Sequence, residues 1–145
     1  MRQWLWFWGL LASVWVASAQ PATTLYVQFI RGTHEAKPAE KSWKPIGPVL
    51  RERLEPIWRW PYYWEIRRDA VKVVEHKTSS ATLNPEFSLQ IEWLTDKKRE
   101  IRLYRKGQLA RRERGTLDSL SILGGDRESG ESWFIVVRSD EPGNP

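Results

Sequence analysis

The segment 57–66 constrains the fold more than any other part of the sequence, because it places five aromatic residues in seven positions around a proline. Pro61 cannot continue a helix and pushes Trp60 towards an extended conformation. Beyond it, alternation along a strand separates the set Tyr62, Trp64 and Ile66 from the set Tyr63, Glu65 and Arg67. We expect the first, wholly apolar or aromatic, face to be buried beneath the preceding helix. Exposed rings that stack on sugars or bases are the competing interpretation.

Residues 1–19 are typical of a secretory signal peptide. Arg2 supplies a positive charge, residues 4–16 form an uncharged and mainly apolar run, and residues 17–19 (Ala-Ser-Ala) match a cleavage site before Gln20. The run is shorter than the roughly 20 apolar residues of a membrane span. We therefore expect an exported protein, periplasmic or extracellular. An uncleaved leader that anchors the chain in the membrane is the alternative.

The composition limits how the domain can be stabilised. The chain has ten tryptophans, four of them in the leader, and no cysteine. An exported domain of this kind has neither disulfides nor thiol chemistry, so its stability must come from a hydrophobic core. Residues 20–139 are enough for a single domain of ordinary size. Residues 140–145 are polar and contain two prolines, and they are predicted to be a disordered tail.

One helix is predicted before the aromatic segment. It begins at Gly47-Pro48, since proline in the first turn costs no hydrogen bond. The predicted buried stripe consists of Leu50, Leu54 and Ile57, at i, i+4 and i+7. Proline inside a helix costs about 3 kcal/mol. Pro56 should therefore end the helix near Leu54 or kink it there.

Alternating apolar and polar residues predict strands over most of the remaining chain. The predicted strands are 25–30, 62–68, 71–76, 87–93, 100–105, 108–114, 120–123 and 133–137. The second and third should pair across Asp69-Ala70, and 77–85 is predicted to be a turn or an irregular edge. Because 133–137 is apolar on both faces, we expect it to be a central strand covered on both sides, at least in part.

These elements predict an α+β fold with one short helix packed on a curled antiparallel sheet of about six or seven strands. A single short helix cannot cover a wide sheet, so the sheet must curl or leave one face to solvent or a partner. A small β-barrel or sandwich with one helix is the alternative.

Positive charge is concentrated in the predicted hairpin 97–114. This segment has nine basic and two acidic residues, a net charge of +7, whereas the rest of the chain after the leader is net −3. Such a surface attracts lipid headgroups or acidic polysaccharides, and export makes nucleic acid the least suitable anion. Solvation of a sheet face and protection of an edge strand are the competing interpretations. The candidate anion-binding residues are Lys97, Lys98, Arg99, Arg102, Tyr104, Arg105, Lys106, Arg111, Arg112 and Arg114.

The sequence contains no recognisable catalytic, cofactor or metal motif. His34 and His76 belong to no spaced metal-binding pattern, and adjacent Glu75 and His76 should point to opposite faces of a strand. No nucleophile elbow occurs, and Gly124-Gly125-Asp126 is predicted to be a turn. We therefore expect no cofactor and no metal, and a binding role in preference to an enzymatic one. Paired carboxylates that hydrolyse an envelope polysaccharide are the alternative.

Several motifs spread over the chain resemble segments of a known type of small protein. They are residues 43–46 (Trp-Lys-Pro-Ile), the aromatic exit from Trp58 to Ile66, and the segments 103–109, 122–125 and 133–138. Together with the leader they resemble small exported bacterial proteins of uncharacterised function, and the resemblance implies no activity. We expect a non-enzymatic module of the bacterial envelope that binds an envelope protein or an anionic polymer. A structural subunit that pairs through a sheet edge is a further alternative.

Overall fold

The computed structural model describes residues 19–124 and 132–143, so the predicted leader lies almost entirely outside the described residues. The described residues form one helix and nine strands in two antiparallel sheets. The elements are β1 Ala22–Thr33, β2 Lys44–Pro45, α1 Pro48–Trp58, β3 Tyr62–Val74, β4 Thr78–Thr82, β5 Phe87–Trp93, β6 Lys98–Arg105, β7 Gln108–Thr116, β8 Ser121–Gly124 and β9 Ser132–Arg138.

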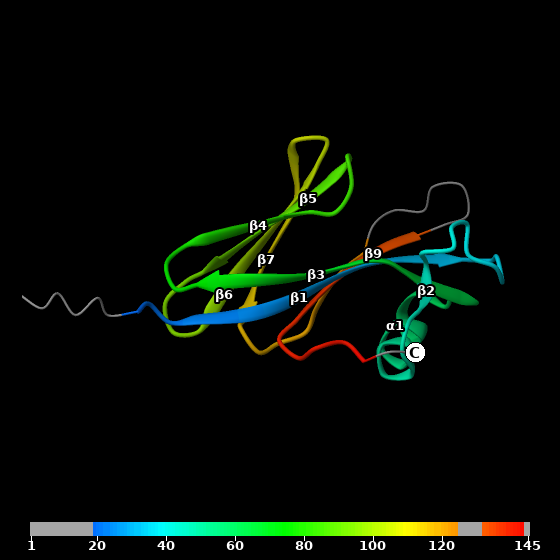
Figure 1. Cartoon of the computed structure of the whole chain (residues 1–145), viewed down its shortest axis with the longest axis horizontal. Helices are drawn as coiled ribbons and strands as arrows, with labels where there is room; N and C mark the ends of the chain where they lie inside the picture. Colours follow the sequence, from blue (N-terminus) through cyan, green and yellow to red (C-terminus); the bar gives the residue numbers. More distant parts are fainter. Residues whose placement is uncertain (1–18, 125–131, 144–145) are drawn as a thin grey trace, which may run out of the picture.

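The first and last strands of the described chain belong to the same sheet. Its order is β2-β3-β1-β9-β8, with β1 paired antiparallel to β3 along its whole length and to β9 from Tyr26 to Gly32. The second sheet is a meander of the consecutive strands β4-β5-β6-β7. Figure 1 shows the long β1–β3 ribbon, with the meander towards one end and α1 near the other.

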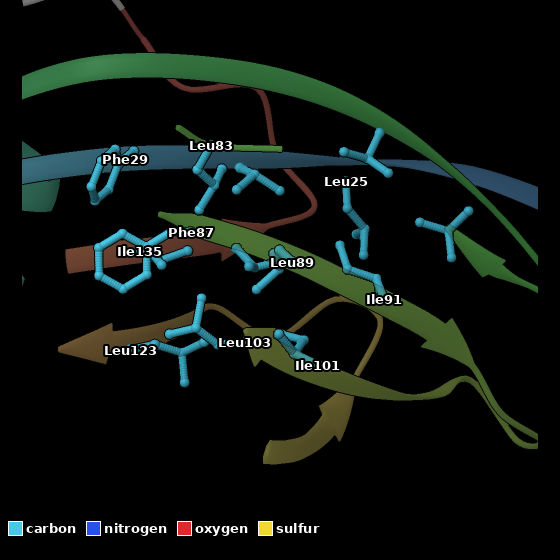
Figure 2. Close-up of a cluster of buried hydrophobic side chains, with 14 of the residues drawn as sticks. Leu25, Phe29, Leu83, Phe87, Leu89, Ile91, Ile101, Leu103, Leu123 and Ile135 are labelled. Carbon is cyan, nitrogen blue, oxygen red and sulfur yellow. The ribbon is translucent and has the colours of Figure 1, made fainter. Parts of the chain in front are cut away.

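The larger hydrophobic core lies between the two sheets. Leu25 and Phe29 from β1 and Ile135 from β9 meet Leu89 and Leu103 from the meander (Figure 2). These five side chains are at most 1% exposed. Aromatic contacts extend the core, because the ring of Phe87 lies 5.8 Å from that of Phe29 and 4.7 Å from that of Trp133.

A smaller core lies on the opposite face of the five-stranded sheet, beneath α1. Leu50 and Leu54 of the helix belong to one cluster with Ile30, Phe134 and Val136. Residues of β9 therefore alternate between two cores, and every residue from 132 to 137 is buried. The prediction of a central strand covered on both sides is confirmed.

One short helix and antiparallel strands are confirmed, but a single curled sheet is wrong. The strands divide because β3 runs without a turn through Asp69 and Ala70, which pair with Val27 and Tyr26 of β1. The chain then turns into the second sheet, where Thr78–Thr82 is a regular edge strand. Two facing sheets correspond to the sandwich form of the alternative, and the described residues form no closed barrel.

The prediction for the faces of the aromatic segment is wrong. Tyr63 and Glu65 are buried on the side of α1, whereas Ile66 packs against the core between the sheets and Tyr62 is exposed. The alternation from Tyr62 to Ile66 is as predicted, but α1 packs on the side of Tyr63 and not on the side of Ile66. A bulge at Ile66, where Phe29 pairs with Arg67 and the next residue of β1 pairs with Glu65, reverses the alternation only in the rest of β3.

The helix runs through Pro56 to Trp58, so the predicted end near Leu54 is wrong. Leu50 and Leu54 are buried as predicted, but Ile57 is 65% exposed. Trp58 replaces it, with its ring 4.7 Å from the ring of Phe134. The exposed Pro56 meets solvent, and the N–H of Arg59, which has a left-handed φ of 55°, closes the helix on the carbonyl of Glu55.

Part of the predicted tail packs on the domain. Pro142 is buried, and the Arg68 guanidinium donates to the carbonyls of Pro142 at 2.9 Å and Gly143 at 3.3 Å. Residues 144–145 lie outside the described residues. None of the helices in the described part of the chain has the length and apolar character that crossing a membrane requires.

Candidate functional site

Most of the candidate basic residues lie on the β6–β7 hairpin. Arg102 of β6 lies opposite Gln90 of β5 and Arg112 of β7, on the face of the meander that points away from the core. The neighbouring row consists of Glu92, Glu100 and Arg114. Arg102 donates to Glu92 at 2.9 Å and to Glu100 at 3.4 Å, so the two rows form one network.

Glu100 is the centre of this network. Its side chain is 6% exposed and pairs with Arg112 at 3.0 Å and Arg114 at 2.9 Å, in addition to Arg102. Burial opposes ionisation, but the hydrogen bonds from Arg114 and Arg102 and the charge of Arg112 hold the pKa of Glu100 below its ordinary value. Three guanidiniums thus surround one carboxylate, and the network keeps an excess of positive charge.

Arg99 does not belong to this surface. It is fully buried and donates to the carbonyls of Thr116 at 2.7 Å and Ser119 at 2.5 Å, and to the hydroxyl of Ser121 at 2.9 Å. Burial lowers the pKa of Arg99, although the negative charges of Glu113 and Asp118 act in the opposite direction. Arg99 therefore fastens the β7–β8 connection to β6, and an anion on the surface does not reach its guanidinium.

Arg105 and Tyr104 have partners on β5 or just before it. The Arg105 guanidinium donates to Glu86 at 2.6 Å and lies 5.4 Å from the centre of the Phe87 ring. This contact lowers the pKa of Glu86. The Tyr104 hydroxyl donates to the side chain of Gln90 at 3.4 Å. Both side chains therefore already have hydrogen-bond partners on β5 or just before it.

The remaining candidates are exposed. Lys97 lies in the β5–β6 turn and Lys106 in the β6–β7 turn, both with positive φ, and Lys98 and Arg111 lie on the strands. Strand β7 is an edge strand of the meander, and five consecutive residues, Gln108–Arg112, are exposed. The structure thus brings Arg102, Arg112 and Arg114 together, keeps Arg99 inside, and leaves the anion-binding interpretation a prediction for the exposed members.

Neither histidine belongs to a group of side chains in the described part of the chain that could hold a metal ion. The His34 ring packs 4.9 Å from Trp60. His76 has a φ of 61°, which breaks strand alternation and brings its Nε2 atom 3.6 Å from the Glu75 carboxylate, so the expectation of opposite faces is wrong. Within residues 19–124 and 132–143, no three histidine, aspartate or glutamate side chains form a group that could hold a metal ion.

Sequence reasoning missed a buried polar cluster on the helix side of the five-stranded sheet. Gln28 of β1 donates through Nε2 to Glu65 at 2.6 Å, and Arg68 donates to both oxygens of the same carboxylate at 3.0 Å. Arg68 also holds Pro142, so this chain of contacts joins β1, β3 and the segment after β9. The only signal in the sequence is a lone carboxylate within the aromatic segment.

Two cavities flank this cluster. Glu65 and Arg68 line the first, of about 240 Å³, together with Lys44 of β2. Gln28 lines the second, of about 420 Å³, which lies between the start of α1 and the segment after β9. The residues lining the second cavity are Gln28, Gly47, Pro48, Val49, Leu50, Arg138, Asp140, Glu141, Pro142 and Gly143.

The architecture, with the basic hairpin on one sheet and the polar cluster on the other, defines the chain as an antiparallel two-sheet protein with one covering helix. No protein-family model matches the sequence, and neither a curated protein nor a solved structure is significantly similar to it.

Proposed function

We propose that this chain is a binding module that takes up an anionic polysaccharide along strand β7 and the outer face of the meander. The observation that carries the proposal is the exposed edge strand with Arg111, Arg112 and Arg114 within four positions. Glu100, the carboxylate nearest to two of them, is already shared among three guanidiniums. The surface therefore has more positive charge than its own carboxylates neutralise.

The spacing of the cations suits a polymer. Alternate residues on a strand are about 7 Å apart, so Arg112 and Arg114 present two charges in a row on one face. Lys98 and Lys106 lie at opposite ends of β6 and extend the positive surface along the hairpin. The affinity that results from several weak contacts of this kind depends strongly on the salt concentration, because dissolved ions screen exposed charges.

The test is elution from a dextran sulfate column in a salt gradient. The variant K97Q/K98Q/K106Q/R111Q removes four exposed charges for which the described residues provide no ion pair, so Glu100 keeps its partners. The matched control K37Q/K41Q/K72Q/K77Q removes four exposed charges elsewhere. We expect the hairpin variant to elute at clearly lower salt than the control. Elution of the two variants at the same salt concentration would show that binding depends on net charge alone, which would contradict the proposal.

A further inference from the structure

We propose that an anionic polysaccharide bound to the meander joins two copies of this chain, through antiparallel pairing of their β7 strands centred on Arg112. The inference rests on the proposed function, because the polymer supplies the negative charge that this pairing requires. Without the polymer, the repulsion between the basic strands keeps the chain monomeric.

The open edge of β7 has backbone groups that a further strand can use. The N–H of Leu117 donates to the carbonyl of Lys97 at 2.8 Å, and pairs with and without hydrogen bonds alternate along an antiparallel ladder. Arg112 and Arg114 therefore belong to pairs that are not hydrogen-bonded to β6, and their N–H and C=O groups are directed to the open edge. A strand that pairs with these groups extends the meander beyond β7.

The charges of β7 complement those of a second copy in one register. When Arg112 lies opposite Arg112 of the second copy, Arg111 of each copy lies opposite Glu113 of the other, which gives two cross-strand pairs of opposite charge. Arg111 is exposed and Glu113 is partly exposed, and neither has an ion pair within residues 19–124 and 132–143. Pairing centred on Glu113 would instead bring two carboxylates together and place Arg112 opposite Arg114. The charge pattern therefore selects the register centred on Arg112.

The arginines at the centre of this register explain why the polymer is needed. The two Arg112 side chains lie directly opposite each other, and like charges in this position destabilise a sheet. The Arg112 side chain is 56% exposed, and its carboxylate partner Glu100 is shared with Arg102 and Arg114. A polyanion that crosses the two Arg112 side chains removes the repulsion and contacts the basic surface of both copies. Binding of the polymer and pairing of the strands therefore favour each other.

The test is the molar mass of the protein in sedimentation equilibrium, without and with a dextran sulfate hexasaccharide. We expect a monomer alone and a dimer with the oligosaccharide. In the dimer, the amides of Arg112 and Arg114 should exchange with solvent at least about tenfold more slowly, because they donate to the second copy. A monomer at saturating oligosaccharide, or unchanged exchange of these two amides, would overturn the proposal.

Exchange of the charges of Arg111 and Glu113 separates strand pairing from net charge. E113R makes the chain more basic but places like charges opposite each other in both cross-strand pairs. We expect E113R to elute from dextran sulfate at higher salt than the wild type, and its oligosaccharide-bound dimer to dissociate at least about tenfold more readily. R111E, at an exposed position, breaks the same pairs and should weaken the dimer by a similar factor. R111E/E113R has the net charge of the wild type and restores both pairs, so its dimer should be stable to within about threefold of the wild type.

The results of these experiments distinguish the inference from the proposed function. Dimerisation of E113R and R111E equal to that of the wild type would overturn the inference, as would a wild type that dextran sulfate retains but that stays monomeric with the oligosaccharide. A wild type that dextran sulfate does not retain at low salt would overturn the proposed function and the inference with it.

Discussion

At the scale of single residues, Glu100 shows how a few charges organise a surface. Three guanidiniums from two strands converge on a carboxylate that is almost completely buried. Removal of the charge would leave Arg112 and Arg114 without this partner and would leave a polar side chain among cations. The carboxylate therefore contributes to stability and holds the three guanidiniums close together on the outer face of the meander.

This arrangement predicts a dependence of stability on pH. The pKa of Glu100 in the folded protein is below its ordinary value of 4.5, so folding favours the ionised form. The resulting stabilisation is complete above the pKa of the unfolded chain and is lost as the pH falls through the lower folded value. We expect E100Q to be less stable than the wild type at pH 7 and to lose less of its free energy of unfolding between about pH 5 and pH 3.

Urea denaturation at each pH measures this difference. E52Q on the exposed face of α1 is the matched control and should follow the wild type. Parallel stability curves for E100Q and the wild type would show that the arginines do not stabilise the ionised carboxylate. Glu86 has a pKa that is also lowered, by its hydrogen bond from Arg105, so some acid sensitivity should persist in E100Q.

At the scale of elements, α1 is defined by contacts that its own sequence does not specify. Pro56 interrupts its hydrogen bonding, yet the helix continues to Trp58 because the Trp58 ring packs on Phe134 and against the backbone of Gly124. A Cβ atom at Gly124 would lie 2.7 Å from this ring, so β8 approaches the helix closely at that point. Packing of the last turn therefore outweighs the local cost of the proline.

Replacement of Pro56 by alanine should stabilise the protein. Alanine restores the N–H that can bond to the carbonyl of Glu52, and the exposed position loses no buried contact. The greater freedom of the unfolded chain offsets part of this gain. We expect P56A to raise the free energy of unfolding by about 1–2 kcal/mol in urea denaturation. Destabilisation by P56A would mean that the proline ring itself is needed at this position.

The elements differ in how far the sequence predicts them. Strand β5 begins and ends as predicted, because apolar and polar residues alternate along it and one face is wet. The sheets could not be predicted, since the partners of β1 are distant in sequence and no local pattern identifies them. Ile57 and Ile66 were misplaced for a related reason: the helix meets the sheet through Trp58, and it packs on the face of β3 that carries Tyr63 and not on the face that carries Ile66.

The candidate sites also divide into parts that a local sequence pattern predicts and parts that depend on residues distant in sequence. The basic hairpin could be predicted because its charges are adjacent in sequence. The burial of Arg99 could not, since the carbonyls that hold it belong to the β7–β8 connection. The cluster of Gln28, Glu65 and Arg68 could not be predicted either, because Gln28 and Glu65 are 37 residues apart and no local pattern connects them.

At the scale of the whole molecule, one sheet serves two cores. The five-stranded sheet is covered by the meander on one face and by α1 on the other, with β1 and β9 at its centre. The meander has only one covered face, and its edge β7 lies almost fully in solvent. Stability should therefore fall from the centre of the first sheet towards the edge of the second.

Native-state hydrogen exchange measures this gradient. We expect the amides of β1 and β9 to exchange at least about a hundredfold more slowly than the bonded amides of β7, because local opening frees edge strands first. Protection of β7 equal to that of β9 would contradict the gradient. In that case β7 would be covered in solution, for example by a second copy of the chain.

The position of β1 between β3 and β9 also has a consequence for the order of folding. The meander pairs neighbours in the chain and can form early, whereas Tyr26 meets Arg138 only across a loop of about 110 residues, and such closures are slow. A chain emerging from the ribosome has β1 and β3 long before β9. Until β9 is synthesised, one edge of β1 is unpaired and the surface that Phe134 covers in the folded protein is exposed. A nascent chain would thus need protection at this edge, where the first strand to be synthesised later pairs with the last.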